Sequence, residues 1–134
     1  MTEPAAPRLT WQLEELVDEI VAEAYADPAA PAAVSRLLTS VEAGTARHLK
    51  TGVVALPPGF RGVPHTHDAE ELNICLRGTG TLVIGGQEVR VEPGTVLWTP
   101  ADLPHVAHVD EDGDVMVLVY GYAPGSAPIV RQAE

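Results

Sequence analysis

The chain has 134 residues, which fits one domain with its own hydrophobic core, and 46% of them are hydrophobic. Its formal net charge of -11 argues against nucleic acid or an anionic membrane surface as a partner, because both attract clustered Lys and Arg. The single cysteine, Cys75, permits no intrachain disulfide, and the sequence shows neither a signal peptide nor an apolar span of about 20 residues. We therefore expect a soluble cytoplasmic protein.

Two short helices are predicted within an N-terminal extension, residues 1–43. Apolar residues recur every three or four positions over residues 11–25, which is typical of an amphipathic helix, with Thr10 as its N-cap. Asp27, followed by proline, is expected to end this helix and to open a second one, which Gly44 terminates. The apolar side of the second helix would consist of Val34, Leu37, Leu38 and Val41.

Residues 44–134 are predicted to form a β-barrel domain, because short β-rich runs alternate there with glycine and proline. The runs lie near residues 47–56, 65–67, 71–77, 80–84, 87–91, 95–99, 105–109 and 115–122. Many short strands with regular turn signals indicate an all-β sandwich or barrel. The segment that begins at Ala123 is expected to be a loose end or an arm.

Two histidines at one strand indicate a metal site. His65 and His67 are two residues apart, so both imidazoles lie on the same face of a strand. Glu71 begins a same-face series in the next run, and His105 supplies a third imidazole. Three imidazoles and a carboxylate suit Fe, Mn, Co, Ni, Cu or Zn, whereas Ca and Mg prefer oxygen ligands. Glu70 is the competing carboxylate, but the alternation of faces favours Glu71.

Two stretches of the sequence resemble the two characteristic motifs of the cupin superfamily. The first runs from Gly59 to Gly78 and holds His65, Thr66, His67 and Glu71 at the family's spacing. The second runs from Gly94 to His105 and holds Pro100 and Asp102. Asp102 and Val109 depart from the family's pattern, but neither position is a metal ligand in the family.

The resemblance covers roughly residues 47–122 and is closest to small bacterial single-domain cupins. It implies a cupin β-barrel, also called a double-stranded β-helix or jelly roll, with one divalent transition metal at its mouth. The implied metal ligands are His65, His67, Glu71 and His105. It also implies a small-molecule substrate and a homodimer.

The last predicted strand places Tyr120 and Tyr122 on one face, together with Met116 and Leu118. If this face lines the barrel, Tyr120 is a candidate acid or base beside Glu71, and both are candidate catalytic residues. If it is the outer face, the tyrosines pack outside. The candidate substrate-binding residues are Arg61, Asn73, Trp98 and Tyr122.

Three functions remain open at this point. Open coordination positions on the metal allow an oxygen-rich or anionic small molecule to bind, which favours a metal-dependent enzyme. Oxygenase chemistry with Fe2+ is the first expectation, in specialised metabolism, and a zinc- or nickel-dependent isomerase or lyase is the second, with Mn2+ as a further metal. The third is a non-catalytic sensor of a small molecule or metal, whose helical segment 10–42 binds a protein partner.

Overall fold

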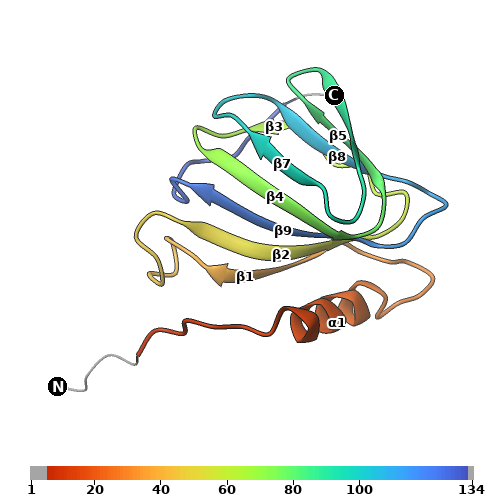
Figure 1. Ribbon diagram of the computed structural model, residues 1–134, viewed down its shortest axis with the longest axis horizontal. Helices are drawn as coiled ribbons and strands as arrows, with labels where there is room; N and C mark the ends of the chain where they lie inside the picture. The colour runs from red at the N-terminus through yellow and green to blue at the C-terminus, as the bar shows by residue number, and fades with distance from the viewer. Residues whose placement is uncertain (1–5, 133–134) are drawn as a thin grey trace.

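The computed structural model describes residues 6–132 and places two antiparallel five-stranded sheets face to face, with a helix beside the first sheet (Figure 1). In spatial order, the first sheet consists of β1 (Val34–Thr39), β2 (Lys50–Leu56), β9 (Met116–Ala123), β4 (Glu70–Arg77) and β7 (Val96–Thr99). The second consists of β10 (Val130–Arg131), β3 (His65–Thr66), β8 (His105–Val109), β5 (Gly80–Ile84) and β6 (Gln87–Val91). The prediction of an all-β barrel is confirmed in part: the fold is mostly β, with one helix beside it.

The described range leaves out the first residues of the predicted extension and the last residues of the predicted barrel domain. Residues 1–5 of the predicted extension and residues 133–134 of the predicted barrel domain lie outside it. No helix within residues 6–132 is long and apolar enough to cross a membrane. The predicted division between residues 43 and 44 stays a prediction, although β1, which precedes it, pairs with β2, which follows it.

The helix α1 (Leu13–Ala24) confirms the amphipathic pattern predicted for its segment. Its apolar side packs on the outer face of the first sheet, where a cluster of buried residues is made of Leu16, Val17, Ile20, Ala24, Val53, Ala55, Val115 and Val117. Thr10 is not the N-cap: Gln12 occupies that position, and its side chain makes no capping hydrogen bond. The start of the helix therefore depends on its packing and not on a cap.

The second predicted helix is wrong, because the segment forms the edge strand β1 instead. Val34 and Leu38 pack toward α1. Leu37 belongs to the alternate set of side chains along the strand and is exposed. Asp27 does not open a helix, since its carboxylate accepts a hydrogen bond from the backbone N–H of Ala29 at 3.1 Å within a turn. The free edge of β2 offers this segment a full set of backbone partners, and that pairing outweighs its weak helical pattern.

Strand β9 lies at the centre of the first sheet, and its two faces have different neighbours. Val117 faces α1, whereas Met116 and Leu118 belong to the core between the sheets. Tyr120 and Tyr122 share the face of Leu118, and all three line the same cavity. The face that carries the tyrosines is therefore the inner one, which decides between the two alternatives that the sequence leaves open.

The C-terminal segment is more ordered than the sequence indicates. Strand β10 pairs with β3, with Val130 opposite Thr66 and Arg131 opposite His65. The backbone N–H of Gln132 also donates to the carbonyl of Pro64 at 2.8 Å. The expected loose end is therefore an edge strand beside the predicted metal-binding strand.

Candidate metal centre

Three strands and one connection bring the predicted metal ligands together. His65 lies on β3 and is paired directly with His105 at the start of β8. His67 follows β3 in the connection to β4, and Glu71 lies on β4 in the other sheet. The site therefore joins the two sheets at one end of the barrel.

The three histidines form a compact cluster. One ligand atom of each of His65, His67 and His105 lies within 4.8 Å of the others. The ring centroids of His65 and His105 are 4.2 Å apart, and those of His67 and His105 are 5.0 Å apart. His67 and His105 are buried, and His65 is partly exposed at the edge of the cavity. This spacing suits three imidazoles that surround a single ion.

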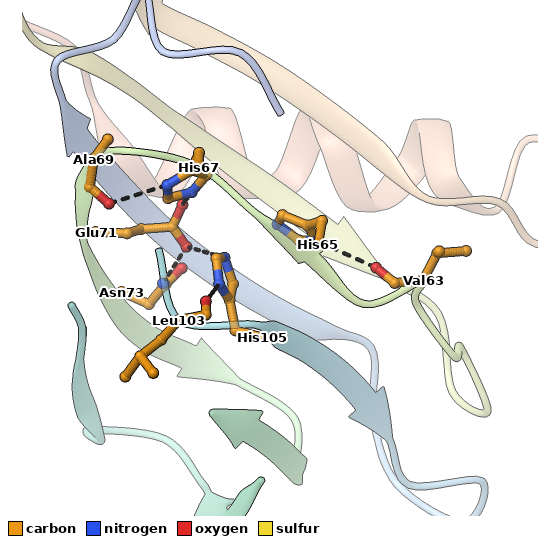
Figure 2. Close-up of polar contacts among 8 residues, drawn as sticks. All are labelled: Val63, His65, His67, Ala69, Glu71, Asn73, Leu103 and His105. Carbon is orange, nitrogen blue, oxygen red and sulfur yellow. Dashed lines mark hydrogen bonds and ion pairs between the residues drawn. The ribbon is translucent and has the colours of Figure 1, made fainter. Parts of the chain in front are cut away.

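Backbone carbonyls orient all three rings in the same way (Figure 2). The Nδ1 atom of His65 lies 3.2 Å from the carbonyl of Val63, and that of His105 lies 3.0 Å from the carbonyl of Leu103. The Nδ1 atom of His67 lies 3.0 Å from the carbonyl oxygen of the residue two positions later. Because a carbonyl can only accept, each Nδ1 donates, and the neutral rings of His65 and His105 keep the lone pair of Nε2 for a metal. The Nε2 atom of His67 faces a carboxylate oxygen of Glu71 at 3.3 Å instead, so this ring would give up its Nε2 proton when it binds a metal.

His105 provides the test of whether the cluster fits a metal. Its Nε2 atom is buried and has no hydrogen-bond partner. A buried polar atom of this kind is costly unless something satisfies it, and a metal ion satisfies a lone pair of Nε2. The donor set of three imidazoles therefore fits a divalent transition metal.

Glu71 lies against the histidine cluster and is held on both sides. One carboxylate oxygen is 3.3 Å from Nε2 of His67, and the other accepts a hydrogen bond from the amide of Asn73 at 2.8 Å. The second oxygen is also 3.9 Å from Nε2 of His105. Glu70, the competing carboxylate, is exposed, so the structure places Glu71 and not Glu70 at the cluster.

The charges in the site depend on one another. Burial alone would raise the pKa of Glu71, but hydrogen bonds from His67 and Asn73 outweigh burial and hold that pKa below its ordinary value. The same hydrogen bond with Glu71 raises the pKa of His67. Burial lowers the pKa of His65, which keeps this imidazole neutral and able to bind a metal.

A cavity of about 310 Å³ opens beside the histidines and is lined by aliphatic side chains together with polar, charged and aromatic ones. The Tyr122 ring stacks on His67, with centroids 4.9 Å apart and planes inclined by 14°. The Tyr120 hydroxyl lies 3.2 Å from the hydroxyl of Ser35, and both residues line the cavity. Two of the predicted pocket residues, Tyr120 and Tyr122, are therefore beside the cluster, as is Asn73.

Two other predicted pocket residues lie elsewhere. Trp98 is 59% exposed on β7, opposite Leu72, and does not line this cavity. Arg61 is exposed and lines a neighbouring hollow of about 460 Å³, which shares His65 with the cavity. Because β7 carries Trp98 toward the outside, the structure does not bring this residue to the candidate site.

Sequence reasoning missed Ser35 and Lys50, which line the cavity from β1 and β2. Ser35 was hidden by the wrong helix prediction. Lys50 is the only lysine of the chain, and its strand pairs with β9 so that it lies opposite Tyr122. Its being the only lysine was the one feature of the sequence that could have drawn attention to Lys50. Only the pairing of β2 with β9 shows that its side chain reaches the cavity.

The chain belongs to the cupin domain family, whose match covers residues 52–121. Among curated proteins it is similar to the dimethylsulfoniopropionate lyase DddW of Ruegeria pomeroyi, with 29% identity over 90 residues, which is 67% of this chain and 57% of the lyase. The chain spans less than two thirds of the length of the curated relatives that it matches. The cupin fold predicted from the sequence is confirmed, with one N-terminal helix in place of two.

Solved structures show the same fold. The polyketide cyclase RemF from Streptomyces resistomycificus superposes with a TM-score of 0.63 at 24% identity, over 76% of this chain and 72% of the cyclase. A salicylate 1,2-dioxygenase from Pseudaminobacter salicylatoxidans superposes with a TM-score of 0.70 at 14% identity, over 87% of this chain and 37% of the dioxygenase. At such identities the likeness concerns the fold alone.

Proposed function

We propose that this cupin is a metal-dependent enzyme that acts on a small, anionic or oxygen-rich metabolite. The observation that carries the proposal is the orientation of His65, His67 and His105. Their Nδ1 atoms are held by carbonyls, one ligand atom of each ring lies within 4.8 Å of the others, and two of the three rings, those of His65 and His105, line one cavity. This preorganisation is typical of a metal site that leaves room for a substrate.

These three histidines would hold the metal, with Glu71 as a fourth ligand. A bound divalent metal supplies Lewis-acid chemistry and positions a substrate oxygen. Iron(II) is the first expected metal from the sequence, and zinc, nickel and manganese are the alternatives.

Proton transfer is the chemistry that the cavity wall supports best. The Tyr120 hydroxyl shares a hydrogen bond with Ser35, so it can give or take a proton beside a bound substrate. Tyr122 packs flat on His67 and restricts where a substrate can lie. Together with the similarity to a lyase, these groups favour an elimination or isomerisation, with Tyr120 as the acid or base.

Oxygenase chemistry, which the sequence placed first, is now the second candidate. Its support is the donor set of three imidazoles and one carboxylate, together with the fold shared with a dioxygenase. The sensor hypothesis depended on a helical segment free to bind a partner. Since α1 buries its apolar side on its own sheet, nothing in the described residues supports that hypothesis further. The homodimer implied by the family stays a prediction.

The test begins with elemental analysis of natively purified protein, followed by assays of the iron, zinc, nickel and manganese forms. Each form is incubated with a panel of small hydroxy and keto acids, with and without O2. We expect turnover that needs metal but not O2, and at least a hundredfold slower turnover for Tyr120→Phe than for the matched outer-surface variant Trp98→Phe. Consumption of O2 would favour the oxygenase, and no turnover by any metal form would contradict the enzyme proposal.

A further inference from the structure

One positive charge faces the candidate metal cavity from the wall formed by β2. Lys50 is the only lysine among 134 residues, and it is the one Lys or Arg side chain that lines this cavity. The chain as a whole carries a formal charge of -11, so a cationic group on the wall of this cavity is not explained by composition. The charge of Lys50 therefore suits a ligand that carries a negative charge.

Within residues 6–132, no carboxylate forms an ion pair with Lys50, and Glu42 acts on it only as a more distant negative charge. Every ion pair within residues 6–132 involves an arginine or a histidine, and none involves this ammonium group. The carboxylate that lines the cavity, Glu71, is already engaged with His67 and Asn73. The ammonium group can therefore accept an anionic group from outside the chain.

Lys50 is held close to the histidine cluster by an aromatic ring. Its Nζ atom lies 5.6 Å from the centroid of the Tyr122 ring, and that ring stacks on His67. Interaction with Tyr122 also raises the pKa of Lys50, so the side chain carries its charge at neutral pH. Gly125 packs closely on the backbone of Lys50, since a Cβ added to this glycine would meet the Lys50 backbone nitrogen at 2.8 Å.

We infer that Lys50 binds the carboxylate of the substrate, and that the substrate class is a short aliphatic carboxylic acid with a second oxygen that reaches the histidines. Aliphatic side chains, Val54, Leu82 and Leu118 among them, also line the cavity and suit the carbon chain of such an acid. Because a charge-assisted hydrogen bond is stronger than a neutral one, Lys50 distinguishes an acid from its uncharged amide. This inference rests on the proposed function, whose substrate it specifies.

The unique lysine permits a direct test by NMR. Protein labelled with 13C and 15N only in lysine gives the side-chain signals of Lys50 alone. The zinc form is titrated with 3-hydroxypropanoate and 4-hydroxybutanoate, and separately with the two corresponding amides. We expect at least one acid to shift the Lys50 signals in a saturable way, and to bind about tenfold or more tightly than its amide.

Substitutions separate the side chain from the general electrostatic field. Lys50→Met is expected to weaken binding of the acid about tenfold and to leave binding of the amide unchanged, whereas Lys50→Arg retains part of the preference. Arg47→Met is the matched control, since Arg47 is exposed, lies three residues away and lines none of the cavities described here. The labelled wild-type protein needs no variant, so it decides the matter even if Lys50→Met does not fold.

The outcomes distinguish this inference from the proposed function. Zinc content is measured in each sample, and failure of the wild-type protein to take up any metal would count against the proposed enzyme. The same titration without zinc tests Lys50 by itself, and a preference for the acid there supports the carboxylate site independently of the metal. Equal binding of acid and amide, unshifted Lys50 signals, or equal loss in Arg47→Met would overturn the inference.

Discussion

At the scale of single residues, Glu71 and Glu70 provide a sharp comparison, because they are adjacent and face opposite ways. Glu71 lies against two imidazoles, whereas Glu70 is exposed. We predict that Glu71→Gln lowers zinc affinity at least tenfold, since the amide lacks the negative charge that favours a cation. Glu70→Gln should leave the affinity unchanged. Competition with a chromogenic chelator measures both, and equal losses would contradict the assignment of Glu71.

Gly78, the last glycine of the first cupin motif, is predicted to be required for packing as well as for backbone conformation. Its φ is +80°, and an added Cβ would lie 2.6 Å from the Cα atom of Met116 and from the carbonyl of Val115. Gly86 has a similar φ of +82° but nothing within 4 Å of the added atom. Gly86→Ala should therefore cost about 1–2 kcal/mol in free energy of unfolding, from the left-handed backbone alone.

Gly78→Ala should cost about 1–3 kcal/mol more than Gly86→Ala, because the new methyl group collides with backbone that cannot move aside. Urea unfolding of both variants gives the difference. Equal losses in the two variants would show that the close approach at Gly78 is relieved by a small shift of β9.

The residues that sequence could predict are those whose spacing alone places them. His65, His67 and Glu71 lie within seven positions of one another, so the alternation of faces and the spacing of the cupin motif together grouped them. Lys50 and Tyr122 are far apart in sequence and meet only through the pairing of β2 with β9. Alternation could not show which face of β9 lies inward, since both faces are apolar and both are covered.

At the scale of whole elements, the same limit explains the segment that was predicted as a second helix. Its apolar residues fit a helical spacing about as well as an alternating one, so local pattern could not choose between them. The edge of β2 decides in favour of a strand, and Arg36 on β1 then forms ion pairs with Glu19 and Glu23 of α1. Such distant partners are not visible in the local sequence.

The packing of α1 on the first sheet gives a prediction about this element. Ile20 is fully buried beneath the helix, whereas Leu13, also on α1, is 40% exposed. Ile20→Ala should lower the free energy of unfolding by about 2–5 kcal/mol, because it removes buried methyl groups and leaves a cavity. Leu13→Ala should cost less than about 1 kcal/mol. Chemical denaturation measures both, and a small effect at Ile20 would mean that α1 is not docked in solution.

The loop that follows β8 is predicted to make stability depend on pH in the acid range. Arg90 forms an ion pair with Asp110, whose carboxylate also accepts a hydrogen bond from Thr79 at 2.8 Å, and these contacts lower the pKa of Asp110 from 3.8 to about 2. Since the folded state holds the proton less tightly than the unfolded state, the stabilisation is present above about pH 4 and is lost as the pH falls to about 2.

Unfolding midpoints in urea at pH 7, 4 and 2 test this dependence. Asp110→Asn should remove this part of the pH dependence, while Asp112→Asn in the same loop should leave the wild-type profile unchanged. If Asp110→Asn and the wild type lose the same stability between pH 4 and pH 2, the ion pair does not contribute. The effect is expected to be small and to shrink with added salt, because Arg90 and Asp110 are at the surface.

At the scale of the whole molecule, the candidate site connects the two sheets. Two of the histidines belong to strands of the second sheet, and Glu71 belongs to the first. The barrel positions these groups through strand pairing, so the apo protein is expected to fold without a metal. A metal would then act as a cross-link between the sheets, and its affinity for the folded state would appear as added stability.

We therefore predict that thermal stability rises with free zinc and returns to the apo value on chelation. At a concentration a thousandfold above Kd, the added free energy is about 4 kcal/mol, which corresponds to roughly 10 °C or more in Tm for a chain of this size. His105→Ala should abolish the dependence on zinc, because it removes one of the two buried imidazole ligands. His108→Ala is the matched control, since His108 lies on the same strand but outside the cluster. A zinc-dependent rise that survives His105→Ala but not His108→Ala would place the ion elsewhere on the barrel, and equal Tm values with and without zinc would mean that the histidine cluster does not bind it.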